Sequence, residues 1–439
     1  VLLGLSYANI KFFYKNKATN NQQNFLWLSL LGVFVNLTVF LLLFFLMAQL
    51  FPSIKESNLW KMKWLILLLV WVLSFSQLLN KYISNLKRIV VPNIFENLFP
   101  KLANLSAFCL LFYMGVSEKL AYWVFFLFFV VALLGYFYYL YNLEGFNVSL
   151  STGFLQKNNF LKEVVTYSLF IFMGNIGNFI ATRIDNYMIG EYIGFKENGI
   201  YSTFLSIIGL ITIPQMGLYS ISAPIINKAL EENKYADLNT FHKKTALNLF
   251  FVGLTLFTCI LVGFPYLTTF IKNGEQFLPY QNILTILGFS LLFDLATGFN
   301  GYIISMSKYF KFNMVVMLFL AISTILFNYY FINYTELGII GVAIATSIAL
   351  TLFNLIKIIF NYIKFGVFPL SIKMFFACTF ALIGYFASGL LVNLSSPFLN
   401  LIFKPLIVLL VMFVANYVLT IFPLQNILNK TFIKNLFTF

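Results

Sequence analysis

The chain has 439 residues, of which 61% are hydrophobic, 20% are aromatic and only 10% are charged. Its mean hydropathy is +0.88, whereas about a quarter of the residues of soluble domains are charged. No soluble core could bury this much apolar surface, so the composition excludes a soluble protein and indicates a multi-pass membrane protein. The net charge of +14 is spread along the chain and does not indicate a nucleic-acid partner.

Apolar stretches long enough to cross a bilayer as helices follow one another through the chain. The short alternating segments of a membrane barrel are absent. We expect an all-α protein with thirteen helical stretches, at 1–14, 25–50, 63–84, 94–116, 121–141, 164–190, 200–226, 245–271, 279–306, 312–332, 337–363, 370–393 and 399–422. The first stretch is too short to cross alone, and the chain begins with Val1 rather than Met, so we expect that a preceding part is missing.

Few residues suggest chemistry. Cys109, Cys259 and Cys378 fall within predicted helices and are expected to be small packing residues rather than disulfides or ligands. The single histidine, His242, is expected in a basic cytoplasmic loop without a metal site. The sequence has no nucleotide-binding loop, zinc motif or nucleophile elbow. We therefore expect neither an enzyme nor a cofactor, and a proton or sodium gradient as the energy source.

The basic residues are divided unequally between alternating loops. If the loop after the first stretch is cytoplasmic, the opposite side holds only eight of the 28 Lys and Arg residues: Lys55, Lys61, Lys63, Lys119, Arg183, Lys196, Lys272 and Lys404. The other 20, Lys357 among them, are assigned to the cytoplasmic side. Because short loops rich in Lys and Arg stay in the cytoplasm, we expect a cytoplasmic C-terminal tail.

Two segments that lie 220 residues apart resemble each other. Residues 80–93 (NKYISNLKRIVVPN) and 300–313 (NGYIISMSKYFKFN) share an Asn, a Tyr-Ile pair, a basic residue and a closing Asn. Residues 4–15 and 217–228 give a second, slightly shifted match. The offset predicts two six-helix lobes of the same orientation, as in parallel repeats, with roughly 50 residues missing before Val1. Chance similarity between two helix ends is the alternative.

This repeat divides the chain into three parts. We expect an N-terminal lobe at 1–150 without its first helix, a C-terminal lobe at 151–366, and two extra helices with a cytoplasmic tail at 367–439. The stretch 142–163 is rich in Gly, Asn and Ser, as a linker between lobes would be. The seam between the lobes would hold a substrate cavity.

Three stretches also resemble a known family. They are RIDNYMIGEYIGFKENGIYSTFLSI (183–207), GEQFLPYQNILTILGFSLLF (274–293) and ELGIIGVAIATSIA (336–349). Their order and spacing are similar to those of the Wzx-type O-antigen flippases, the polysaccharide-transporter branch of the multidrug/oligosaccharidyl-lipid/polysaccharide (MOP) exporter superfamily. The resemblance runs from about residue 4 to residue 422. The chain departs from the family pattern in lacking its first helix.

The resemblance implies a MATE-like fold, with two six-helix lobes in a V and two further C-terminal helices. It implies that the protein moves undecaprenyl-diphosphate-linked oligosaccharide, an O-antigen or capsule repeat unit, from the cytoplasmic to the outer leaflet of the bacterial cytoplasmic membrane by alternating access. The expected partners are this substrate, membrane lipids, a glycan polymerase and a chain-length regulator.

Other functions stay open. A multidrug cation exporter or a lipid II flippase of the same superfamily are the nearest alternatives, and a membrane oligosaccharide polymerase is a more distant one. A cation exporter would favour several buried carboxylates, and a lipid II flippase would favour a more basic cavity. A polymerase would favour a sizeable outer loop, whereas the loops here are short.

Arg183 and Asp185 place two charges in the predicted helix 164–190. An intramembrane charge normally faces a cavity or a partner. Residues two positions apart point about 200° away from each other on a helix, so only one of them would face a cavity. Arg183 is a candidate for contact with diphosphate, because a guanidinium binds phosphate through two parallel hydrogen bonds. The alternative is that both lie at the outer interface, where Arg183 would reach toward water.

Asp294 lies in the middle of the predicted helix 279–306, with no basic residue within ten positions. Such a carboxylate is a candidate for ion coupling, by exchanging a proton or binding a cation during transport. A structural hydrogen bond to a facing helix is the alternative. Asn300 follows on the same stretch and is a candidate for substrate contact.

Basic residues and prolines supply the remaining candidates. Lys81, Lys87 and Arg88 lie at the expected cytoplasmic mouth, where they would gather an anionic lipid diphosphate. Their alternative role is to set the topology. Pro214 and Pro224 interrupt the helix predicted at 200–226 and are candidates for a hinge, because proline removes a backbone hydrogen bond. A static kink is the alternative.

Overall fold

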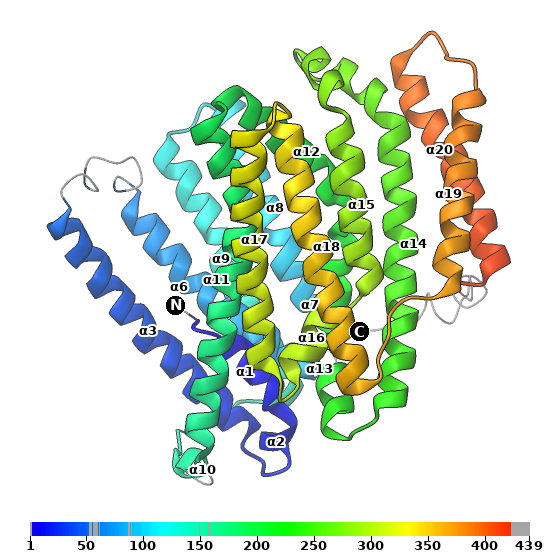
Figure 1. Cartoon of the computed structure of the whole chain (residues 1–439). Coiled ribbons are helices and arrows are strands. Elements are labelled where there is room, and N and C mark those ends of the chain that lie inside the picture. Colours follow the sequence, from blue (N-terminus) through cyan, green and yellow to red (C-terminus); the bar gives the residue numbers. More distant parts are fainter. Residues whose placement is uncertain are drawn as a thin grey trace. The chain divides into compact units, whose positions relative to one another are not determined.

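The computed structural model describes all residues except 1, 52–54, 56–59, 61, 87, 89, 149, 157–158 and 423–439, and except the side chains of 220 and 221. Lys87 and the predicted cytoplasmic tail therefore lie outside the described residues. The described part of the chain is helical and contains no strand (Figure 1). The all-α prediction is confirmed.

The helices of the first half are α1 (Leu5–Lys11), α2 (Phe13–Lys17), α3 (Gln22–Leu50), α6 (Lys63–Asn85), α7 (Val90–Asn93), the π-helix η1 (Ile94–Leu98), α8 (Phe99–Phe112), α9 (Glu118–Glu144) and α10 (Gly153–Gln156). Those of the second half are α11 (Phe160–Tyr192), α12 (Phe195–Gly209), the 3₁₀ turn η3 (Leu210–Thr212), α13 (Ile213–Glu231), α14 (Tyr235–Leu267), the 3₁₀ turns η4 (Thr268–Phe270) and η5 (Gly274–Tyr280), α15 (Asn282–Thr297), α16 (Asn300–Met306), α17 (Phe310–Tyr334), α18 (Gly338–Phe365), α19 (Ile372–Leu390) and α20 (Pro397–Leu419). Each of the thirteen predicted stretches coincides with one helix or with consecutive helices.

Ten helices of the described chain are long and apolar enough to cross a membrane, or eleven if the bent pair of η5 and α15 counts as one span. The predicted stretches 1–14 and 94–116 do not meet this criterion, because each is divided into short helices. α1 and α2 have only seven and five residues. The π-helix η1 separates α7 from α8, and neither is long enough alone.

The helix bounds repeat along the chain at the predicted offset. α9 begins at Glu118 and α18 begins at Gly338, which is 220 residues later. At the same offset, α6 corresponds to α15 and α16 together, and α7 to α8 correspond to α17. Similar elements in the same order are what parallel repeats produce.

The chain forms two compact units by contact. The first consists of residues 1–173, 219–228 and 305–311, and the second of 174–218, 229–304 and 312 onward. Two short segments of the second half thus pack with the first unit. These units are defined by packing and do not test the predicted lobe boundaries, which stay a prediction.

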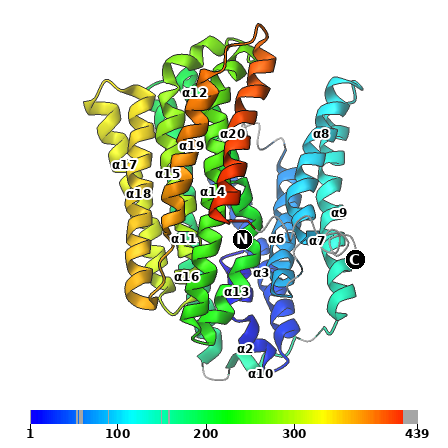
Figure 2. The same ribbon diagram turned by 90° about the vertical axis from the view of Figure 1, so that its right-hand side faces the viewer.

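The first unit is built from apolar faces of α2, α3, α6 and α9. Phe13, Leu26, Leu78 and Tyr82 are at most 2% exposed and belong to one cluster. Figure 2 shows α6, α8 and α9 side by side. The hydroxyl of Tyr82 donates to the carboxylate of Glu144 at 2.9 Å. The polar end of this buried aromatic side chain thus has a hydrogen-bond partner.

A set of contacts that we call the Lys11 clasp joins distant segments within the first unit. Lys11 Nζ donates to the carbonyl oxygens of Met306, at 2.7 Å, and Ser307, at 3.0 Å. Asn227 Nδ2 donates to the carbonyl oxygens of Ile10, at 3.1 Å, and Lys11, at 2.9 Å. These bonds explain why 219–228 and 305–311 pack with the N-terminal residues. All three segments border loops that the charge distribution assigns to the cytoplasmic side.

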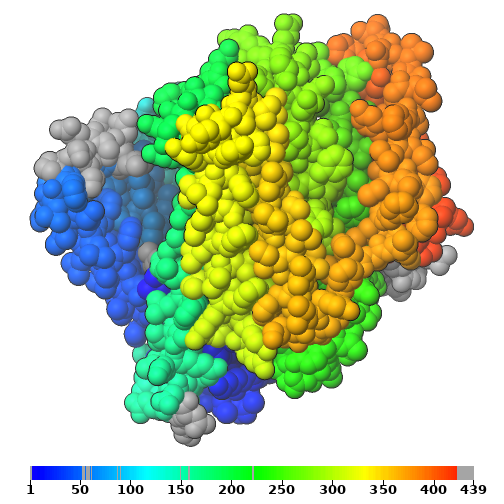
Figure 3. Space-filling model, viewed as in Figure 1, coloured from blue at the N-terminus to red at the C-terminus, as the bar shows by residue number. Residues whose placement is uncertain are grey.

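Helices of the second unit approach one another closely where small residues permit it. A Cβ atom on Gly177 of α11 would lie 3.0 Å from the carbonyl carbon and oxygen of Met317 on α17. Backbones that come this close are typical of membrane helices. α17 and α18 form the yellow to gold part of the face in Figure 3. Phe312 of α17 stacks on Phe360 of α18 at 3.9 Å between ring centroids. Their outer side chains, such as Leu326 at 60% exposure, are apolar, as lipid contact requires.

Candidate functional site

Polar side chains recur on α18 at helical spacing, and we call them the polar seam: Thr346, Asn354, Lys357 and Asn361. Residues three, four and eight positions apart share one face of a helix. Asn354, Lys357 and Asn361 are buried. Thr346, Asn354 and Asn361 each hydrogen-bond to a polar residue of a neighbouring helix in the second unit, so that a polar layer runs through an otherwise apolar bundle.

Asp185 forms one end of this layer. Its carboxylate accepts hydrogen bonds from Asn328 Nδ2 at 2.7 Å, Thr346 Oγ1 at 2.7 Å and Tyr201 Oη at 2.9 Å. It is 4% exposed. Three donors from α12, α17 and α18 compensate the buried charge, as a desolvated carboxylate requires. Asp185 therefore lies within the bundle rather than at the interface, and its role in substrate binding stays a prediction.

The structure separates Arg183 from Asp185. Arg183 is exposed on the face of α11 that carries Phe179 and Tyr187, both 66% exposed. The opposite face, with Gly177, packs on α17. No hydrogen bond or ion pair joins Arg183 to another described residue, so its guanidinium is free to bind a ligand or to reach the interface.

Asp294 lies in the middle of the polar layer and is half-buried. Its Oδ1 accepts from Asn354 Nδ2 at 2.9 Å, and its Oδ2 accepts from Gln215 Nε2 at 3.4 Å. Lys357 follows Asn354 by one turn on the same face of α18. The sequence showed no partner for Asp294 because its two hydrogen-bond donors come from other helices.

Lys357 is the functional candidate that the sequence analysis missed. The charge count placed it on the cytoplasmic side, but it lies in α18 and is 6% exposed. Its Nζ is 3.7 Å from the ring centroid of Phe353, and a Cβ atom on Gly301 would lie 3.5 Å from Nζ. A basic residue inside the predicted stretch 337–363, with Asn at helical spacing on both sides, was the signal that could have identified it.

Asn300 and His242 are more deeply buried than the sequence suggested. Asn300 is 0% exposed, and Asn361 Nδ2 donates both to its side-chain oxygen, at 2.7 Å, and to its backbone oxygen, at 3.1 Å. Asn300 thus connects α16 to α18 and is covered in this conformation. His242 was expected in a loop, but α14 begins at Tyr235 and buries it against Gly298. The polar first turns of α14 explain the error, because hydropathy alone places the helix start later.

The two hinge candidates lie where the helix predicted at 200–226 is interrupted. Pro214 is the second residue of α13 and follows the 3₁₀ turn η3. Because proline has no N–H, it cannot bond to the carbonyl of Leu210, which lies at the start of that turn. Pro224 lies inside α13. The two contact units change within this helix, between Leu218 and Tyr219. Movement at these prolines stays a prediction.

The basic candidates of the first unit are accessible. Lys81 is half-buried on α6, and Arg88 is exposed between α6 and α7. Neither side chain has a hydrogen-bond or ion-pair partner among the described residues. Both side chains are accessible to an anionic group, and their role in substrate binding stays a prediction.

The first unit also has a carboxylate that the sequence analysis did not single out. The π-helix η1 carries Glu96, and Asn80 Nδ2 donates to it at 2.8 Å. Asn80 is also 3.1 Å from the hydroxyl of Tyr136, which donates to the carbonyl of Pro92 at 3.0 Å. These side chains and Gln77 line a cavity of about 130 Å³. A π-helix often marks a functional position, but sequence periodicity does not reveal one.

Comparison with known proteins places this geometry in context. The MatE family matches residues 170–330, which include Asp185, Asp294 and Asn300. A crystal structure of MATE in the straight conformation shares 15% identity, covers 83% of this chain and 84% of its own, and has a TM-score of 0.70. The chain has the MATE transporter fold. No curated protein matches the chain.

Other solved structures agree with this fold. A MOP superfamily transporter from Pyrococcus furiosus, described as having a binding pocket of reverse polarity that suggests a different function, shares 16% identity over 83% of this chain and 84% of its own, with a TM-score of 0.70. An outward-facing multidrug resistance MATE transporter shares 14% identity with the same coverage, with a TM-score of 0.67. Identities this low establish the fold alone. Together with the MatE match, they support a multi-pass membrane transporter of the MOP superfamily.

Proposed function

We propose that the protein translocates an undecaprenyl-diphosphate-linked oligosaccharide, an O-antigen or capsule repeat unit, from the cytoplasmic to the outer leaflet of a bacterial cytoplasmic membrane. The MATE fold supports transport by alternating access. The observation that carries the substrate class is Lys357, a buried cation between two buried asparagines of the polar seam. Such a site suits an anionic, hydroxyl-rich substrate, because ammonium binds phosphate and amides bind sugar hydroxyls.

The carboxylates of the second unit support this substrate rather than a cation. Asp185 already accepts three hydrogen bonds. Asp294 accepts from Asn354 and Gln215. A cationic drug would have to displace these donors. Arg183, Lys81 and Arg88 have no such partners, and we assign them to contact with the diphosphate.

Asp294 is our candidate for ion coupling. It is half-buried, and Lys357 follows its donor Asn354 by one turn of α18. Protonation of Asp294, or binding of sodium to it, would weaken its attraction for Lys357 and leave that cation available for phosphate. A proton or sodium gradient would then drive the cycle, without a cofactor.

A multidrug cation exporter is the second candidate function. The observation that favours it is Glu96, whose carboxylate lines a cavity in the first unit. The MATE fold is equally consistent with drug export. The two functions differ in the charge of the substrate, which an experiment can vary directly.

The decisive test is complementation of a bacterium that lacks its own O-unit flippase. The variants are Lys357→Met and Arg183→Ala, with Lys243→Met as the matched control, because Lys243 is an exposed lysine near the start of α14. We expect wild type and the control to restore surface glycan, and Lys357→Met and Arg183→Ala to fail at equal protein level. The partner polymerase and chain-length regulator must be present in the host.

Each result has a clear reading. If wild type and both variants restore surface glycan, the flippase proposal stands, but Lys357 and Arg183 are not part of the substrate site. Failure of wild type, with increased resistance to cationic drugs that Glu96→Gln abolishes, would replace the flippase proposal by drug export. Protease accessibility of the tail in sealed spheroplasts would test its cytoplasmic location.

A further inference from the structure

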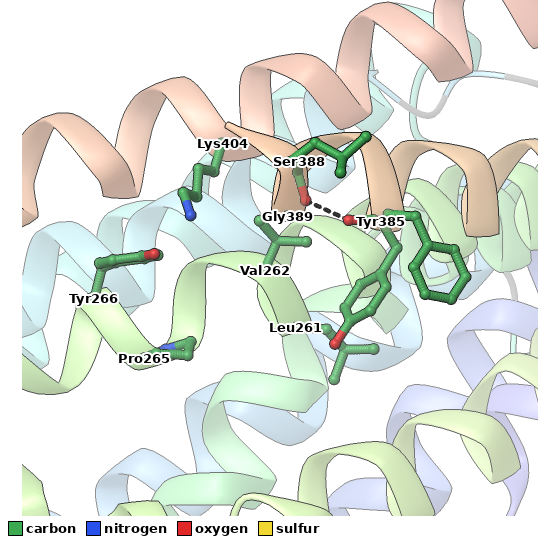
Figure 4. A pocket seen from close by; sticks show the side chains of 10 residues that line it. Leu261, Val262, Pro265, Tyr266, Tyr385, Ser388, Gly389 and Lys404 are labelled. Carbon is green, nitrogen blue, oxygen red and sulfur yellow. Dashed lines mark hydrogen bonds between the residues drawn. The ribbon is translucent and has the colours of Figure 1, made fainter. Parts of the chain in front are cut away.

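A second pocket lies in the second unit, between α14, α19 and α20 (Figure 4). Its volume is about 350 Å³. The three helices pack side by side, as Figure 1 shows at its right-hand edge. In Figure 4 the ammonium group of Lys404 extends from α20 toward Tyr266 of α14, and the ring of Tyr385 on α19 extends toward Leu261. No step of the proposed transport cycle uses this pocket.

The pocket contains a cation without a counter-charge. Lys404 is 7% exposed. Its Nζ donates to Asn393 Oδ1 at 2.6 Å, and Tyr266 Oη donates to the same oxygen at 2.8 Å. No carboxylate pairs with Lys404 among the described residues, and the whole chain has no Asp or Glu after Glu336. A neutral amide satisfies one hydrogen bond but does not compensate the charge of a buried ammonium.

The walls of the pocket provide an opening, a hydrogen-bond acceptor and an apolar edge. At Gly389 an added Cβ atom would meet nothing within 4 Å, so the pocket is open on that side. Pro265 has no N–H, so the carbonyl of Leu261 one turn earlier lacks its usual α-helical donor and is offered as an acceptor. Phe386 and Leu390 line the open edge at 66% and 86% exposure. The site thus offers a cation, an acceptor and an apolar edge.

We propose that this pocket binds the phosphate headgroup of an anionic glycerophospholipid. The phosphate would pair with Lys404, a headgroup hydroxyl would donate toward Leu261, and the acyl chains would lie along Phe386 and Leu390. A free inorganic anion would gain nothing from the apolar edge, which is why we assign a lipid. With the proposed orientation, the site belongs to the outer leaflet. The inference does not depend on which substrate is transported.

The experiment measures lipid retention by native mass spectrometry. The purified full chain in detergent is titrated with phosphatidylglycerol or with phosphatidylcholine. We expect preferential retention of phosphatidylglycerol and a loss of about tenfold or more in Lys404→Met, the effect of one charge-assisted hydrogen bond. Lys404→Arg should retain the lipid. Gly389→Phe should exclude it without touching the charge. Lys272→Met, which removes an exposed lysine before η5, is the matched control.

Three outcomes would overturn the proposal. The first is equal retention of the two lipids by wild type. The second is unchanged retention of phosphatidylglycerol in both Lys404→Met and Gly389→Phe. The third is displacement of the lipid by millimolar inorganic phosphate, which would identify a simple anion site. Melting curves accompany each variant, and if Lys404→Met fails to fold, Gly389→Phe and Lys404→Arg still decide.

Discussion

Thr346 on α18 donates a hydrogen bond to the carboxylate of Asp185 on α11 at 2.7 Å. The two residues are far apart in sequence, yet this bond and those from Tyr201 and Asn328 connect four helices of the second unit at one carboxylate. The buried charge of Asp185 therefore has a structural explanation that requires no ligand. Its partners also show how a single buried acid determines the relative positions of α11, α12, α17 and α18.

Replacement of Asp185 by Ala should destabilise the protein. It leaves the buried donors Asn328 and Tyr201 and the half-buried Thr346 without an acceptor, and each buried donor costs about 1–3 kcal/mol. We expect a lower melting temperature in detergent and lower expression than for Arg183→Ala, the control two residues away on the exposed face. Equal melting temperatures for the two variants would contradict the structural role of Asp185.

Replacement of Asp294 by Asn should uncouple transport from the ion gradient. In proteoliposomes, an imposed pH or sodium gradient should accelerate translocation of a fluorescent lipid-linked oligosaccharide by the wild type only. Asp237→Asn is the control, because this carboxylate is exposed at the start of α14. A gradient response that persists in Asp294→Asn would assign coupling to another residue, with Glu96 as the next candidate.

Replacement of Lys357 by Met should weaken binding of the anionic substrate while the helix bundle stays folded. Met has a similar length and removes the ammonium, together with its contact with the ring of Phe353. We expect at least about a tenfold loss of affinity for a lipid diphosphate, the effect of one charge-assisted hydrogen bond. Lys357→Arg should preserve part of the affinity. If Lys357→Met binds the lipid diphosphate as tightly as wild type does in a ligand titration, the polar seam does not contact the phosphate.

Replacement of Lys11 by Ala should open the Lys11 clasp. The change removes the donor to Met306 and Ser307. Thiol labelling of Ser307→Cys in inside-out vesicles should become about tenfold faster. Lys308→Ala removes a neighbouring exposed charge without a clasp bond and should leave the labelling rate unchanged. Equal rates in both backgrounds would mean that the clasp does not hold this segment.

Replacement of Gly177 by Leu should disturb the packing of α11 on α17. The added side chain meets the backbone of Met317, which cannot move aside as a flexible side chain does. Overpacking of this kind costs about 1–3 kcal/mol. We expect a lower melting temperature, whereas Gly199→Leu should be tolerated, because a Cβ atom there meets nothing within 4 Å.

Much of the fold could be predicted because hydropathy is a local property. Every predicted stretch is helical, and the 220-residue offset recurs in the helix bounds. The repeat also extends to contacts. Asn80 bonds to Tyr136 on α9, and Asn300 bonds to Asn361 on α18, the helix at the corresponding place. Two asparagines that were matched by sequence thus connect corresponding pairs of helices.

The candidate site could be predicted only in part, because partners come from distant helices. Asp294 appeared unpaired since its neighbours in sequence are apolar, whereas Gln215 and Asn354 reach it from α13 and α18. Lys357 was counted as a topological charge, since a count of basic residues contains no information on burial. The partners of Asp294 and the burial of Lys357 both depend on how the helices pack, which the sequence does not show.

The π-helix η1 has a consequence for how this protein tolerates changes in length. A π turn accommodates one residue more than the α-helix around it. A single-residue deletion within Ile94–Leu98 would therefore convert η1 into a regular α-turn, and α8 would keep the face that it presents to α9. Glu96, however, would rotate away from Asn80. The position of this carboxylate is thus determined by the number of residues in the segment, and homologous chains that differ by one insertion or deletion here should differ in the polarity of this cavity while keeping the same helices.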